Sequence, residues 1–294
     1  MLVFTHPDCL RHDPGRGHPE SPERLRVLLT RLDTDGRFPV RAADPAPREA
    51  LLAVHPASYL DSLERMARVG GGALDPDTIM NALSWAAAVG GAGASLAALA
   101  SALEGVPAFA APRPPGHHAL RDRAMGFCLL ANAVIVARAA QRAGRQQVLI
   151  VDWDVHHGNG TQALVESDPA IRYVSLHQWP AYPGTGRADE TGVGNVFNVP
   201  MGPAQPPGRY VEALWNAVVR ATDGWTPDLL VVSAGFDAMA GDPLGGFTLE
   251  PTHYADLTRR LRDRLPSAGF VSLLEGGYAP SRVADGVLAH LAAV

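Results

Sequence analysis

The 294-residue sequence contains no lysine, so its 25 basic residues are all arginine. A coding bias toward GC-rich codons is the favoured explanation, and avoidance of modification on the protein's own lysines is the alternative. The arginines are scattered along the chain, and the formal net charge is -5. This distribution argues against a surface that binds nucleic acid or an anionic membrane.

Cysteine is scarce as well, because Cys9 and Cys128 are the two in the chain. A disulfide framework is therefore excluded as the source of stability, and Cys128, which lies in an apolar segment, is expected to be simply buried. We find no apolar run long enough to cross a bilayer, and no basic stretch followed by an apolar one at the amino terminus. These absences predict a cytoplasmic protein without a membrane partner.

Hydrophobic residues are abundant instead, at 47% of the chain, which is enough to bury a substantial core in one α/β domain covering residues 1–294. The β-rich apolar runs are continuous rather than alternating, as in strands covered on both faces. The pattern predicts a mostly parallel, doubly wound sheet with helices on both faces. The expected strands are 107–111, 148–151, 171–176, 228–233 and 270–274, and the expected helices are 81–103, 125–143 and 209–222.

Residues with metal-binding side chains directly follow the expected strand 148–151. Residues two apart on an extended chain point to the same side, so Asp152, Asp154 and His156 can face one point. Carboxylates and an imidazole together favour a divalent metal. The other expected strands also lead into reactive side chains, and ligands of open α/β sheets bind beyond the carboxyl ends of the strands. We therefore expect the five loops to meet at one site.

A third metal ligand is predicted at Asp242, in the Gly-Asp-Pro sequence that follows the strand 228–233. Three protein ligands leave a position open for water and substrate, as in hydrolytic metal centres. An isolated aspartate before proline more often forms a turn, and that is the alternative for Asp242.

Two adjacent histidines, His117 and His118, follow the strand 107–111. Imidazoles can take a proton from an attacking water and return it to a leaving amine near neutral pH. Asp152 and Asn159 are available to orient their second nitrogens. His157 is expected to be structural.

Three aromatic residues complete the expected site. Tyr278 follows Gly276 and Gly277 and could donate its hydroxyl to the oxyanion that forms when water attacks a carbonyl. An ordinary half-buried tyrosine is the alternative. Phe127 and Tyr182 could form the walls of an apolar channel, with core packing as the equally weighted alternative.

Taken together, these residues resemble the histone deacetylase family, within the arginase/deacetylase fold. The matching motifs span nearly the whole chain in the same order. They are HisProGluSerProGluArgLeu at 18–25, ArgProProGlyHisHisAla at 113–119, GlyPheCysLeuLeuAlaAsn at 126–132, ValAspTrpAspValHisHisGlyAsnGly at 151–160, SerLeuHis at 175–177, TyrProGlyThrGly at 182–186, AlaGlyPheAsp at 234–237, GlyAspProLeuGly at 241–245 and GluGlyGlyTyr at 275–278.

The resemblance implies one zinc ion held by Asp154, His156 and Asp242, with Tyr278 polarising the amide carbonyl of the substrate. An Asp-His-Asp set can also take iron(II) or cobalt. A channel for the acylated amine is implied as well. Its implied lining is Gly126, Phe127 and Tyr182, with Leu244 at the rim.

The resemblance also assigns the proton transfers. It implies His118 as general base and then general acid, and His117 as its electrostatic partner, hydrogen-bonded to Asp152. A structural potassium ion near the zinc is implied too. Its ligands would be Asp152, Asp154, His156, Ser175 and Leu176, partly through backbone carbonyls.

Three positions depart from familiar members of this family. Asn159 stands where class I enzymes carry an aspartate, which places the chain nearer the class II and bacterial branch, and the lost charge should lower the basicity of His118. Tyr182 replaces a more usual phenylalanine. Leu244 replaces the acidic gatekeeper of polyamine-selective relatives, whose dimerisation insert also has no counterpart here, and this weakens a polyamine reading without excluding it.

The leading hypothesis is therefore metal-dependent removal of an acetyl or other short acyl group from acyl-lysine. Deacylation of acetylpolyamines or of another small N-acyl amine is the first alternative. A catalytically silent acyl-lysine binder is less favoured, because the catalytic residues and all three ligands are present. Binuclear ureohydrolase chemistry needs ligands for a second metal, and the sequence offers enough for one. The preferred acyl group and the oligomeric state are left open.

Overall fold

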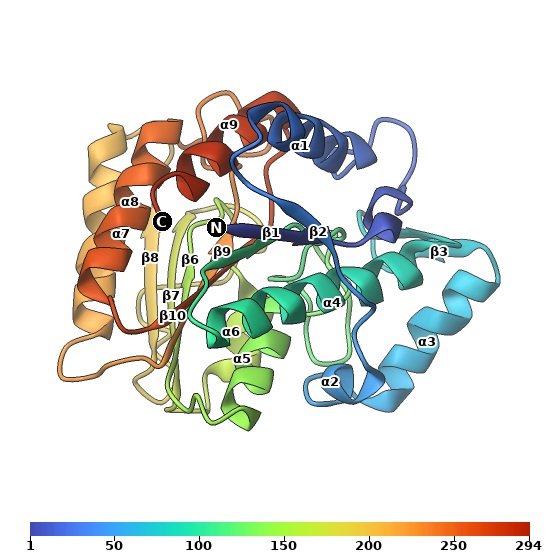
Figure 1. The fold of residues 1–294 in the computed structure, drawn as a ribbon, viewed down its shortest axis with the longest axis horizontal. Coiled ribbons are helices and arrows are strands. Elements are labelled where there is room, and N and C mark those ends of the chain that lie inside the picture. Colours follow the sequence, from blue (N-terminus) through green and yellow to red (C-terminus); the bar gives the residue numbers. More distant parts are fainter.

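The computed structural model describes residues 1–294 and is built around an eight-stranded sheet in which every neighbouring pair of strands is parallel. The strand order is β2-β1-β5-β10-β9-β6-β7-β8 (Figure 1). These strands are β1 (Leu2–Thr5), β2 (Val40–Ala42), β5 (Ala108–Ala110), β6 (Val148–Asp152), β7 (Ile171–Gln178), β8 (Val196–Met201), β9 (Leu229–Ala234) and β10 (Gly269–Leu274). A separate antiparallel pair consists of β3 (Gly71–Ala73) and β4 (Ile79–Asn81).

Helices cover both faces of the large sheet (Figure 1). One face packs against α1 (Pro22–Asp35), α7 (Pro207–Ala221), α8 (Pro251–Arg264) and α9 (Pro280–Leu291). The core on the other face includes α2 (Arg48–Leu52), α3 (Ala57–Arg68), α4 (Ser84–Leu103), α5 (Asn132–Arg142) and α6 (Asn159–Val165). A short 3₁₀ turn, η1, spans Pro7–Leu10.

The core consists of two apolar clusters, one on each face of the sheet, and the residues of each central strand alternate between them. In β6, Val148 and Ile150 belong to one cluster, whereas Leu149 and Val151 belong to the other. Side chains alternate across a strand, so a continuous apolar run buries both faces. This confirms the predicted parallel, doubly wound α/β fold.

All five predicted strands are present, but three strands of the large sheet were not predicted. β2 forms one edge, and all three of its residues are exposed, so it carries almost no apolar signal. β1 lies between β2 and β5 and is apolar, but a run of four residues does not by itself separate a strand from a helix. β8 forms the opposite edge and contains Asn198 and Pro200, which are uncommon within strands.

The predicted helix 125–143 is wrong in its first turns, because α5 begins at Asn132. Gly126 and Phe127 have φ values of 56° and 67°, in the left-handed region that a right-handed helix cannot contain. Gly144 (φ 88°) follows the end of α5 as predicted. The segment before Asn132 is a loop, and this matters because it reaches the candidate site.

The expectation that no segment could span a bilayer needs one correction. α4 is long and apolar enough to do so by length and composition alone. However, 67% of its most apolar window is buried inside the protein, against β1, β5 and α5. The extent of its burial is that of a core helix.

His290 in α9 gives the fold a pH dependence that can be measured. Its ring is fully buried, Nδ1 donates to Thr258 Oγ1 (2.6 Å) and Nε2 accepts from Ser272 Oγ (2.7 Å). Burial lowers the pKa of His290 to about 3. The unfolded chain therefore binds the proton more readily, so the stability that neutral His290 provides is full above the unfolded pKa of about 6.5 and is lost as the pH falls toward 3.

We expect His290→Gln to remove this part of the pH dependence, because an amide can keep both hydrogen bonds and does not titrate. At about 1.4 kcal/mol per pH unit, the wild type should lose roughly 2 kcal/mol more unfolding free energy than the variant between pH 6.5 and about pH 5. Urea denaturation at both pH values measures the difference. Parallel curves for the two proteins would contradict the assignment.

Candidate active site

The loops after five strands meet at the carboxyl edge of the sheet, as the sequence predicts. A cavity of about 430 Å³ opens at this edge. Each loop contributes to its lining, with His118 following β5, His156 following β6, Tyr182 following β7, Leu244 following β9 and Tyr278 following β10. Side chains far apart in the sequence thus surround one space.

The chain turns repeatedly just after β6. Asp152 Oδ1 accepts the backbone N–H of Asp154 (3.1 Å), and Asp154 Oδ1 accepts the backbone N–H of His156 (2.9 Å). Aspartate favours such turns because its side chain can accept an N–H two residues on. The local sequence therefore places an imidazole beside a fully buried carboxylate, since His156 Nδ1 is 3.1 Å from Asp154 Oδ1.

A second carboxylate, that of Asp237, approaches the same imidazole. Asp237 Oδ2 lies 3.1 Å from His156 Nδ1, and donor atoms of Asp154, His156 and Asp237 all lie within 4.8 Å of one another. Sequence reasoning gave Asp237 no role, although it ends the AlaGlyPheAsp motif after β9. Its position after a buried strand was the signal that could have identified it.

The electrostatics of this cluster favour a cation. Burial alone would raise the pKa of Asp154, but the charge of His117 and the hydrogen bond with His156 hold that pKa well below its usual value. Burial likewise opposes charge on His156, yet hydrogen bonds to Asp154 and Asp237 raise its pKa to about 10. Two carboxylates stabilise positive charge at this point, and a divalent metal uses such a set of oxygen and nitrogen donors.

Asp242, the third predicted ligand, lies in the same loop as Asp237 and is nearly buried. Its carboxylate accepts backbone N–H groups from Leu244 (2.9 Å) and Tyr278 (2.7 Å). Burial and the charge of Asp154 raise the pKa of Asp242, with the two N–H groups opposing them. The structure thus places Asp242 against the Tyr278 loop, while Asp237 is the carboxylate that contacts His156.

His117 is held by Asp152, as predicted. His117 Nδ1 lies 3.1 Å from Asp152 Oδ2, which also accepts the hydroxyl of Tyr173 (3.0 Å). Burial by itself lowers the pKa of His117, but the charges of Asp154 and Asp152 outweigh it and raise this pKa well above its usual value. Positive charge on the imidazole is therefore stabilised here.

His118 has a different environment. Its Nδ1 lies 2.8 Å from Asn159 Oδ1, an acceptor, so Nδ1 carries the proton and Nε2 keeps a lone pair. Burial and the neighbouring His117 and His156 lower the pKa of His118 well below its usual value. The ring centroids of His117 and His118 are 4.0 Å apart. Two adjacent imidazoles with pKa values shifted in opposite directions can do different work: neutral His118 can accept a proton, whereas charged His117 supplies positive charge beside it.

Tyr278 is carried by a loop that depends on two glycines. A Cβ at Gly276 would lie 2.2 Å from Asp237 Oδ2, and Gly277 has a φ of 119°. Burial and the charge of Asp237 raise the pKa of Tyr278 well above its usual value. The phenol therefore keeps its proton and remains a hydrogen-bond donor at the edge of the cavity.

The four predicted channel residues all line the cavity. The Tyr182 ring stands edge-on to His118 at 5.2 Å, and the Phe127 ring stands edge-on to Tyr278 at 5.7 Å between centroids. Leu244 is 42% exposed, which places it at the rim. The lining residues that sequence reasoning missed are His18, Pro19, Pro76, Asp77, Ile79 and Ala181.

Gly126 allows His118 to occupy its position. A Cβ at Gly126 would lie 2.4 Å from His118 Cδ2, and the residue has a φ of 56°. We expect Gly126→Ala to displace the imidazole and to lower kcat about tenfold or more, because small misplacements of catalytic groups are costly. Gly144→Ala is the matched control, since Gly144 has a φ of 88° with open space around its Cβ position. Equal kcat in the two variants would contradict this role.

Three of the five residues of the expected potassium site lie on the adjacent strands β6 and β7, and Asp154 and His156 lie in the loop after β6. Asp152 of β6 is paired in register with Ser175 of β7, and Leu176 follows. Ser175 Oγ contacts His177 Nδ1 at 2.9 Å.

His157, expected to be structural, contacts Thr185 Oγ1 (2.8 Å) and Gln162 Oε1 (2.9 Å), and so helps to hold the loop that carries Tyr182.

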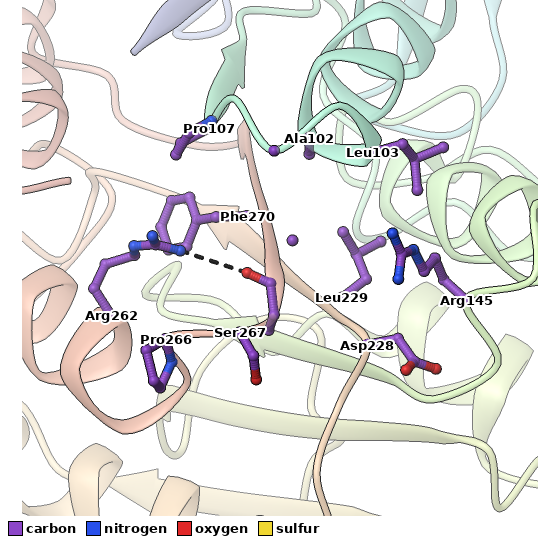
Figure 2. Close-up of a pocket in the computed structure, with 13 residues that line it drawn as sticks. Ala102, Leu103, Pro107, Arg145, Asp228, Leu229, Arg262, Pro266, Ser267 and Phe270 are labelled. Atoms are coloured by element: carbon purple, nitrogen blue, oxygen red, sulfur yellow. Dashed lines mark hydrogen bonds between the residues drawn. The ribbon is translucent and has the colours of Figure 1, made fainter.

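A second, smaller cavity of about 170 Å³ lies at the opposite, amino-terminal edge of the sheet. Figure 2 shows Arg145 and Arg262 on opposite sides of it, with Asp228 below Arg145. Arg262 Nη1 donates to the carbonyl of Ala268 (3.5 Å). None of the predicted site residues lines this cavity.

The carboxyl edge of this parallel sheet carries carboxylates, paired imidazoles and a phenol. This set of groups at this position defines the class of the protein as an α/β hydrolytic enzyme. Its sequence matches the family described as the histone deacetylase domain over residues 18–294. The chain belongs to the histone deacetylase family, a family of amidohydrolases, as its motifs predicted.

The chain is also similar to individual proteins. The chain is 42% identical to the uncharacterized protein slr0245 of Synechocystis, with 99% of this chain and 98% of that protein aligned. It is 40% identical to the histone deacetylase-like amidohydrolase of Pseudomonas aeruginosa, with 91% and 74% aligned. The crystal structure of an acetylpolyamine aminohydrolase from Burkholderia pseudomallei matches with a TM-score of 0.90 and 30% identity, over 100% of this chain and 98% of that one.

Proposed function

We propose that this protein is a zinc-dependent deacylase that removes acetyl or other short acyl groups from acyl-lysine. The observation that carries the proposal is the convergence of His118, His156 and Tyr278 at a cavity walled by the aromatic rings of Phe127 and Tyr182. Aromatic walls suit the alkyl chain of an acylated amine, while the polar groups suit its amide.

The metal would be held by Asp154, His156 and Asp242, with Asp237 orienting the His156 ring. The contact of Asp237 Oδ2 with His156 Nδ1 and the cation-favouring electrostatics support a site here. Asp242 is the proposed third ligand because the family resemblance implies it and because its carboxylate lies close enough to Asp154 for that charge to raise its pKa. When bound, zinc would polarise the substrate carbonyl and lower the pKa of the attacking water.

The chain's own residues supply the proton transfers. With Nδ1 donating to Asn159, His118 Nε2 can accept the proton of the attacking water and later pass it to the leaving amine. His117, paired with Asp152, supplies positive charge next to this site. Tyr278 donates a hydrogen bond to the carbonyl oxygen as negative charge develops on it.

A structural potassium ion would bind on the sheet side of this centre. The register of β6 against β7 brings Asp152, Ser175 and Leu176 next to the loop containing Asp154 and His156. These residues supply oxygen donors, which suit a hard cation. Such an ion would fix the loop that carries the metal ligands.

An acetylpolyamine is the second candidate substrate, because the chain has the fold of the Burkholderia acetylpolyamine aminohydrolase over its full length. A panel of zinc-loaded reactions with an acetyl-lysine peptide, longer acyl-lysine peptides, acetylputrescine and acetylspermidine separates the two. We expect the highest kcat/KM on an acyl-lysine peptide. Preference for the acetylpolyamines would replace the substrate assignment, and stoichiometric zinc without turnover of any amide would overturn the proposed function.

A further inference from the structure

A buried ionic cluster behind the site includes motif residues that the mechanism above does not use. Glu20 is fully buried and accepts hydrogen bonds from two arginines that are also fully buried. Its Oε1 accepts from Arg24 Nη1 (2.9 Å) and Arg113 Nε (2.6 Å), and its Oε2 accepts from Arg113 Nη2 (2.8 Å). His12 Nε2 lies 3.2 Å from the same Oε2. One carboxylate thus bridges two guanidinium groups.

Arg24 extends this cluster to the loop of the catalytic tyrosine. Its Nη2 donates to the carbonyl of Glu275 (2.5 Å), and its Nε donates to the carbonyl of Gly277. The guanidinium carbon lies 5.0 Å from the centre of the Tyr278 ring. Arg24 therefore binds the backbone on both sides of Gly276, immediately before Tyr278.

Arg113 extends the cluster to the loop of the catalytic histidines. It stands four residues before His117, and it also donates to the carbonyls of Cys9 (2.7 Å) and His12 (3.2 Å). The loop contacts the Tyr278 loop separately, because Glu275 Oε2 accepts the backbone N–H groups of Gly116 (2.7 Å) and His117 (3.1 Å). Glu20 is thus the group that joins both arginines.

We propose that Glu20 is a positioning residue that, through Arg24, holds Tyr278 at the distance from the histidine pair that the reaction needs. Arg24 has five N–H donors in a rigid, planar guanidinium. The orientation that Glu20 gives this guanidinium therefore also sets its hydrogen bonds to the carbonyls of Glu275 and Gly277. A buried guanidinium without its carboxylate would turn toward other acceptors or water. The inference rests on the proposed function for its kinetic readout.

The charge state of Glu20 is consistent with this role. Burial alone would raise the pKa of the Glu20 carboxyl, but Arg113, the hydrogen bond with His12 and Arg24 hold that pKa well below its usual value. Glu20 therefore stays ionised.

Glu20→Gln tests the proposal, with Glu23→Gln as the control three residues further along the chain, since Glu23 is exposed and pairs with Arg26. We expect Glu20→Gln to lower kcat about ten- to a hundredfold, the scale known for groups that orient metal ligands, with KM changing much less. Combined with Tyr278→Phe, it should cost little more than Tyr278→Phe alone, because both changes disable the same donor. If the losses of kcat in the two single variants instead multiply in the double variant, as general destabilisation would produce, the proposal is overturned.

A second readout does not depend on turnover. In protein labelled with 3-fluorotyrosine, the ¹⁹F resonance of Tyr278, assigned from Tyr278→Phe, should shift or broaden in Glu20→Gln and remain unchanged in Glu23→Gln. Arg24→Lys is the alternative variant if Glu20→Gln fails to fold. It keeps the buried charge but loses the planar guanidinium, so it should perturb the same resonance. An unchanged Tyr278 resonance in the folded variant would overturn the positioning role. If the wild type deacylates nothing, the proposed function fails while this resonance still tests the inference.

Discussion

Tyr278→Phe is expected to lower kcat by about 10²- to 10³-fold, the loss that follows removal of one oxyanion donor. The effect should fall on kcat rather than KM, because the hydrogen bond strengthens only as negative charge develops on the carbonyl oxygen. The metal should remain bound, since the hydroxyl is not among the proposed ligands. Steady-state kinetics together with metal analysis of the purified variant checks both statements.

Tyr182→Phe is the matched control for that change. Both rings line the same cavity, but Tyr182 stands in the wall beside His118, and its ring is retained in the variant. We expect its kcat to change by less than about threefold, far below the effect of losing an oxyanion donor. A loss equal to that of Tyr278→Phe would mean that the phenols share the role, and an undiminished rate in Tyr278→Phe would remove that residue from the mechanism.

Loss of a metal ligand should have the other large effect. Asp154→Asn and Asp242→Asn are each expected to bind substoichiometric zinc after dialysis and to lose about 10³-fold or more in activity, since the metal supplies several kcal/mol of transition-state stabilisation. The residual metal, measured by atomic emission, reports the cause directly. Chelator treatment of the wild type, followed by zinc, should remove and then restore activity.

Asp237→Asn distinguishes the roles of Asp237 and Asp242, the two carboxylates of the loop after β9. If Asp237 orients the His156 ring, Asp237→Asn should weaken the affinity for zinc about 10- to 100-fold. Zinc loss as complete as in Asp242→Asn would make Asp237 a ligand. Full zinc retention in Asp242→Asn would remove Asp242 from the set.

The local sequence was sufficient to predict much of the centre of the molecule. The runs that became β5, β6, β7, β9 and β10 lie inside the sheet, where both faces are covered, so their apolar character is continuous and easily read. The edge strands β2 and β8 were missed because short or partly exposed strands lack that signal, and β1 was missed because its apolar run has only four residues. Phe127 was placed in a helix because a left-handed backbone at a non-glycine residue is rare and leaves no clear sequence pattern.

The candidate site likewise has features that the local sequence predicts and features that it does not. The sequence by itself determined which groups stand at the strand ends, because a buried run followed by Asp-x-Asp-x-His leaves little choice about where those side chains lie. It could not determine which carboxylates from different loops approach each other, so only the tertiary structure placed Asp237 against His156. Likewise, Glu20 and Arg113 are 93 residues apart, and their contact depends on how the segment before α1 packs against the loop after β5. Strand-end chemistry is a local property of the chain, whereas contacts between loops are decided by packing.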